Sequence, residues 1–151
     1  MDITANVNLI LHAHLPYVRH LEYPKFLEED WLFEALHETY IPLLRVLEEL
    51  EESNKRFKLT ICFSPTFTTM CLDQPLQERF VNYLTSRIEL GEKEVLRTQR
   101  ECPEAYKSAL MYLKAAKENL QYYEDCGRNI LARYASLSKK GSIELIATAA
   151  T

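Results

Sequence analysis

The chain has 151 residues, of which 47% are hydrophobic, and a formal net charge of −4. This length suits one ordinary globular domain, and the negative charge without any basic stripe argues against a nucleic-acid partner. The N-terminal stretch lacks the pattern of a signal peptide, and no apolar run reaches the ~20 residues of a membrane span. We therefore expect a cytoplasmic protein with no membrane partner, in which the four scattered cysteines remain reduced.

Three segments have the composition and period of β-strands: residues 7–12, 57–63 and 142–148. In each segment one line of alternate residues is apolar. The other line is largely polar, with Asn8, His12 and His14 in the first segment, Lys58, Thr60, Cys62 and Ser64 in the second, and Glu144 and Thr148 in the third. Buried parallel strands are usually apolar on both faces. The mixed face therefore favours a polar lumen or cleft, with a solvated sheet face as the alternative.

An amphipathic helix is predicted between the first two strands. Its apolar positions recur every three or four residues and comprise Leu32, Leu36, Tyr40, Leu43, Leu47 and Leu50. Pro42 lacks the N–H that an uninterrupted helix needs, so we expect a kink or two helices, the second starting near Tyr40.

The chain between the second and third strands is predicted to be helical. Ser64-Pro65-Thr66 is typical of a turn that caps a following helix, and Asp73 can cap a helix that has Pro75 in its first turn. Pro103 is predicted to start a further helix, which Gly127 bends or divides. Strands alternating with helices predict a parallel α/β fold, either an open sheet or a barrel.

His12 and His14 are the first candidates for a functional site. Residues two apart in a strand point to the same side, and parallel α/β enzymes place their sites where strands end. The two imidazoles could supply two ligands to a metal ion, donate hydrogen bonds to a polyhydroxylated substrate, or be core histidines bonded to carbonyl groups.

Glu144 is the second candidate, because it stands on the polar line of the third strand between apolar neighbours. A carboxylate in such a place needs a partner if it is buried. It could pair with a cation, orient a histidine or bind sugar hydroxyls, and the simpler interpretation is a solvent-facing glutamate. Phosphate-binding glycine loops and a helical HExxH motif are both missing from the sequence, so nucleotide binding and helix-borne zinc chemistry have no support.

Four stretches of the chain resemble the N-terminal part of glycoside hydrolase family 57, and most of all its 1,4-α-glucan branching enzyme group. In chain order these stretches are LILHAHLPYVRH, EEDWLFEALHETYIPLLRVLEEL, KLTICFSPTFTTMCLDQPLQERF and GSIELIATAAT. The His-x-His-x-Pro stretch corresponds to the first conserved region of the family, and Gly-x-Ile-Glu to the second.

The resemblance implies an α/β fold: the first three β/α units of a seven-stranded (β/α) barrel with parallel strands, here incomplete. It also implies a retaining enzyme of carbohydrate or glycogen metabolism that acts on α-glucan polysaccharide or maltooligosaccharide and uses no metal and no cofactor. In such enzymes the first two conserved regions line the donor sugar site. On this basis His12, His14 and Glu144 are the predicted substrate-binding residues.

The resemblance assigns no catalytic residue, because the family's nucleophilic Glu and acid/base Asp lie on later strands. Residues 1–151 are therefore interpreted as a truncated N-terminal portion of the catalytic domain that is inactive by itself. No helix follows the third strand to cover Ile143, Leu145 and Ala147, so we expect an open edge, low stability or self-association.

Three alternatives to a branching enzyme remain open. The first keeps the family and makes the chain part of an α-amylase or 4-α-glucanotransferase. The second is a fragment of a metal-dependent amidohydrolase-like barrel that uses His-x-His as ligands. The third is a non-catalytic glucan-binding module.

Overall fold

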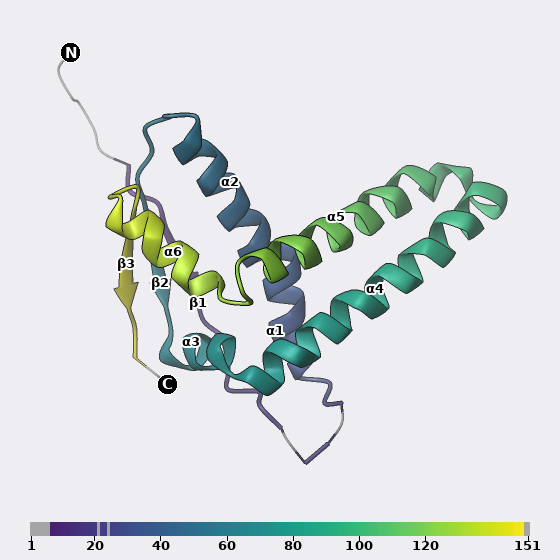
Figure 1. Ribbon diagram of the computed structural model, residues 1–151, viewed down its shortest axis with the longest axis horizontal. Helices are drawn as coiled ribbons and strands as arrows, with labels where there is room; N and C mark the ends of the chain where they lie inside the picture. The colour runs from purple at the N-terminus through teal and green to yellow at the C-terminus, as the bar shows by residue number, and fades with distance from the viewer. Residues whose placement is uncertain (1–6, 21, 24, 150–151) are drawn as a thin grey trace.

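Three parallel strands form the sheet of the computed structural model, which describes residues 7–20, 22–23 and 25–149. They are β1 (Ile10–Ala13), β2 (Leu59–Phe63) and β3 (Ile143–Ala147), in the order β1-β2-β3 (Figure 1). All three lie where the alternation of the sequence predicts them, although each is shorter than its predicted segment. The α/β class and the parallel direction are thereby confirmed.

Helices occupy most of the chain between the strands. They are α1 (Glu29–Ala35), η1 (Leu36–Tyr40), α2 (Ile41–Glu52), α3 (Pro65–Leu72), α4 (Gln74–Glu101), η2 (Pro103–Ala105), α5 (Tyr106–Asp125) and α6 (Ile130–Lys139). The long helices α4 and α5 run side by side as a hairpin that extends away from the sheet (Figure 1). The sheet and the helical hairpin thus form two ends of the molecule, joined by α1, α3 and α6.

The predicted break at Pro42 takes the form of one wide turn. Residues 36–40 form a π-helical turn, in which the N–H of Ile41 donates to the carbonyl of Leu36, and Pro42 lies in the first turn of α2. A π-turn holds one residue more than an α-turn. The buried line therefore continues with Ile41 and Leu44 in place of the predicted Tyr40 and Leu43, which are only partly buried.

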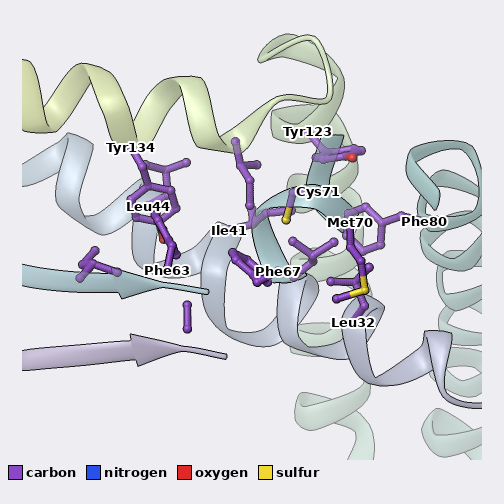
Figure 2. Close-up of a cluster of buried hydrophobic side chains, with 14 of the residues drawn as sticks. Leu32, Ile41, Leu44, Phe63, Phe67, Met70, Cys71, Phe80, Tyr123 and Tyr134 are labelled. Carbon is purple, nitrogen blue, oxygen red and sulfur yellow. The ribbon is translucent and has the colours of Figure 1, made fainter. Parts of the chain in front are cut away.

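Aromatic and aliphatic side chains from the helices fill the core against one face of the sheet. Tyr134 of α6 is fully buried, packs edge-on against Phe63 of β2 at 5.2 Å between ring centroids, and donates a 2.8 Å hydrogen bond to the carbonyl of Tyr40 (Figure 2). Phe67 stacks on Phe63 at 5.5 Å, and Ile41 lies in the same cluster. The contacts join strand β2 to α3, α6 and the wide turn.

Side-chain caps begin two of the helices, as predicted. The Ser64 hydroxyl accepts a 3.2 Å hydrogen bond from the N–H of Phe67 at the start of α3. The Asp73 carboxylate accepts a 3.1 Å bond from the N–H of Leu76 at the start of α4. Gly127, with φ +64°, lies in the turn that separates α5 from α6, so it divides the predicted helix.

The apolar line of β3 is better covered than the sequence suggested. Ile143 is 3% exposed and belongs to the core, and Leu145 packs against the core from its edge. The cover comes from α6, which precedes β3 in the chain and contacts the strand. Only Ala147, at the end of the strand, is exposed as expected.

Candidate functional site

His12 and His14 project from the same side of the sheet at the end of β1. Their ring centroids are 5.5 Å apart and their planes are nearly perpendicular, at 80°. Both side chains are exposed, whereas Ala13 between them is buried on the opposite, helix-covered face. The structure therefore brings the two imidazoles together on the open face, and the core-histidine interpretation is wrong for both.

Glu144 lies on the same open face as the histidines. In the register of the sheet it pairs with Thr60. His12, Cys62 and Ile146 pair with one another in a different row, two residues further along the strands. The Thr60 hydroxyl donates a 3.2 Å hydrogen bond to the Glu144 carboxylate, which is exposed. The expected partner is thus a neutral hydroxyl and not a cation.

The separation of Glu144 from the histidines decides what the group can bind. Strands lie about 4.8 Å apart and rise about 3.3 Å per residue, so the backbones of His12 and Glu144 are roughly 12 Å apart. One small ion cannot touch both groups over such a span. A ligand with several hydroxyl groups can, because it offers hydrogen-bonding atoms over the same distance.

Apolar and thiol groups separate the polar side chains on the open face. Cys62 is buried in the middle of the row, with His12 on one side and the half-exposed Ile146 on the other. Ile10 is likewise exposed on this face, beside Thr60. The face is therefore a mixed surface of donors, acceptors and aliphatic groups.

Ser64 follows β2 at the same edge of the sheet and carries a hydroxyl group. It is fully buried, its hydroxyl oxygen caps α3, and the hydroxyl of Thr66 lies 3.0 Å from it. This hydroxyl is engaged in holding the local fold, so the structure assigns it no chemical role.

Two ion pairs that the sequence did not indicate hold the segment that follows His14. Arg79 of α4 pairs with the buried carboxylate of Glu29 and also donates to the carbonyls of His20, at 2.9 Å, and Tyr23, at 2.8 Å. Arg19 in the same segment pairs with Asp73. The partners are 50 or more residues apart, so no local pattern could have found them.

The described part of the chain contains no cluster of three or more His, Cys, Asp or Glu side chains placed to hold a metal ion. His12 and His14 therefore lack a third such neighbour among residues 7–20, 22–23 and 25–149. In the same residues no helix is both long enough and apolar enough to cross a membrane.

Comparison with solved structures identifies close matches to this arrangement. The α-amylase AmyC from Thermotoga maritima matches with a TM-score of 0.87 and 40% identity over 93% of this chain and 26% of its own. A GH57-type branching enzyme from Pyrococcus horikoshii matches with a TM-score of 0.87 and 33% identity over 95% of this chain and 27% of its own.

Sequence comparison points the same way. A 1,4-alpha-glucan branching enzyme from Thermococcus kodakarensis is 30% identical over 146 residues, which are 96% of this chain and 21% of that protein. The chain thus spans only about a fifth to a quarter of the relatives that it matches. The model of glycosyl hydrolase family 57 matches residues 8–151, nearly the entire sequence, and the chain therefore belongs to that family.

Proposed function

We propose that residues 1–151 form the N-terminal part of the catalytic barrel of a retaining α-glucan-active enzyme. The first candidate is a 1,4-α-glucan branching enzyme. In this proposal His12, His14 and Glu144 contact the donor sugar. The observation that supports it is their common, exposed position on the sheet face opposite the helix-covered core.

The open face supports a barrel. A parallel sheet in an open α/β fold is covered by helices on both sides, whereas a barrel sheet has helices outside and side chains inside. Here the helices pack on the apolar line of the strands, whereas His12 and Glu144 on the other line are exposed and Cys62 on that line is buried. In a seven-stranded barrel this line would face the lumen, and later strands would close the sheet beyond β3.

The chemistry of the face supports a sugar ligand. Imidazole N–H groups donate to sugar hydroxyls, and the Glu144 carboxylate accepts from them. Family membership favours this role for His12 and His14 over the metal-ligand interpretation. The α-glucan class rests on the matched branching enzymes and α-amylase, and the 40% identity to the α-amylase makes hydrolysis the second candidate reaction.

The number of carboxylates on the open face indicates which part of the enzyme would carry out the reaction. A retaining glycosidase needs two of them about 5–5.5 Å apart, one as nucleophile and one as acid/base. The described strand residues of the open face include a single carboxylate, Glu144. Both catalytic carboxylates would therefore come from later strands, and residues 1–151 would bind glucan without turning it over.

Binding of maltoheptaose to the purified chain, measured by isothermal titration calorimetry, tests the proposal. We expect His12→Ala and Glu144→Gln each to weaken binding at least fivefold, because each removes a hydrogen-bonding group from the open face. Glu49→Gln is the matched control, because Glu49 is also an exposed carboxylate but lies on α2. Equal affinity in all four proteins would contradict the assignment of the site.

A further inference from the structure

A groove lies on the helical part of the molecule, apart from the open sheet face. This groove, between η1, α4 and α5, has a volume of about 360 Å³ and is lined only by residues of the helices. Its volume is near the lower end of the ~300–1,000 Å³ typical of small-ligand sites. The groove can therefore hold a short segment of a ligand.

His37, in the π-helical turn, places a fixed hydrogen-bond donor at the groove. Asn119 donates from its amide nitrogen to the His37 carbonyl, at 2.7 Å, and the same nitrogen lies 3.0 Å from His37 Nδ1. The amide oxygen of Asn119 meanwhile accepts from Arg45 at 3.1 Å. These contacts fix the orientation of the amide, so Nδ1 of His37 is an acceptor and the proton is on Nε2.

The Nε2–H of His37 has no partner among the hydrogen bonds of the described residues. His37 as a residue is only 8% exposed, yet no fully buried side-chain nitrogen or oxygen in the described ranges lacks a partner. The nitrogen therefore reaches open space, and the space that His37 lines is the groove. Burial also lowers the pKa of His37, which keeps the ring neutral near pH 7.

The other groove residues combine aromatic rings with charges of both signs. The Arg87 guanidinium lies over the ring of Tyr83, with its carbon 4.7 Å from the ring centroid. Tyr112 is 62% exposed, so the Tyr112 ring is not part of the core. Glu34 and Glu38 add carboxylates. An anion would meet the carboxylates and a cation would meet Arg87, whereas a neutral polyhydroxylated ligand can use both kinds of group and rest its apolar face on a ring.

We propose that the groove between η1, α4 and α5 is a second glucan-binding site, in which Tyr112 supports a sugar ring and His37 Nε2–H and the Glu38 carboxylate bind its hydroxyls. The choice of ligand rests on the proposed function. The site itself is separate from the sheet face, since His12, His14 and Glu144 do not line the groove.

The four histidines of the chain allow the two sites to be observed separately. The full chain, labelled with ¹⁵N-histidine, is titrated with maltoheptaose, and the imidazole ¹⁵N resonances are followed by NMR. We expect the His37 Nε2 resonance to shift and saturate. Tyr112→Ala and Glu38→Gln should each weaken the affinity reported by His37 at least fivefold and leave the affinity reported by His12 and His14 unchanged.

Met111→Ala is the matched control, because Met111 is an exposed neighbour of Tyr112 that does not line the groove. Shifts at His12 and His14 with none at His37 would overturn the second site and leave the proposed function standing. Shifts at His37 alone would support the groove and overturn the sheet-face site. Shifts at His37 that neither Tyr112→Ala nor Glu38→Gln weakens would also overturn the groove, and no shift at any histidine would overturn both sites.

Discussion

Replacing Arg79 with methionine should destabilise the folded chain by about 3 kcal/mol, because it removes one partner of a buried ion pair. The side chain of Glu29, its ion-pair partner, is only 2% exposed, and without Arg79 its carboxylate would keep one described hydrogen bond, from the N–H of His20 at 3.3 Å. The loss of one partner of a buried ion pair is typically worth about 3–5 kcal/mol. The lower end applies here because the Arg79 side chain is itself 20% exposed.

Urea unfolding followed by circular dichroism measures this loss, which is a large part of the ~5–15 kcal/mol that stabilises an ordinary domain. Arg97→Met is the matched control, because Arg97 also pairs with a glutamate, Glu94, but on the open surface of α4, and little change is expected there. The double variant Glu29→Leu/Arg79→Met should recover part of the loss, since it leaves no carboxylate without a partner. A loss below about 1 kcal/mol for Arg79→Met, or no recovery in the double variant, would refute the reasoning.

Four further predictions concern single groups and the isolated chain. Ser64→Ala should cost about 1 kcal/mol in urea unfolding because it removes the cap of α3; an unchanged midpoint would contradict this. Burial raises the pKa of the Cys71 thiol far above its usual range, so iodoacetamide should label the partly exposed Cys102 in the folded chain and Cys71 only after unfolding, as read by mass spectrometry. Burial lowers the pKa of His37 below 6.5, so the unfolded chain binds more protons than the folded chain. The free energy of unfolding should therefore fall as the pH drops from 6.5 towards the folded pKa. The same pH dependence in His37→Gln would show that another group causes it. Amylose incubated with the chain should show neither new reducing ends nor a change in iodine staining, and turnover would contradict the proposed division of catalytic residues.

Local features of the fold could be predicted from the sequence because their causes are local. Alternating residues placed the strands. Ser64 and Asp73 cap their helices because each side-chain oxygen accepts a hydrogen bond from a backbone N–H of the first helical turn. The same alternation placed His12 and His14 on one face, which the structure confirms. These features depend on neighbours only a few residues away.

Contacts between distant segments could not be predicted in this way. Glu29 in the first turn of a helix has the pattern of a surface residue, and only Arg79, 50 residues later, accounts for its burial. His37 likewise depends on Asn119, 82 residues away. Cover for Ile143 comes from a helix that precedes the strand, where we expected none because no helix follows it.

The extra residue in the wide turn between Leu36 and Ile41 determines which side of the helix each later residue faces. Each residue advances an α-helix by about 100°, so deletion of one residue there would swing Ile41 and Leu44 by that angle around the axis. The second half of the helix would then present the wrong side to β2. Insertions and deletions are accordingly far more disruptive at this turn than conservative substitutions, and any redesign of the segment has to preserve its residue count.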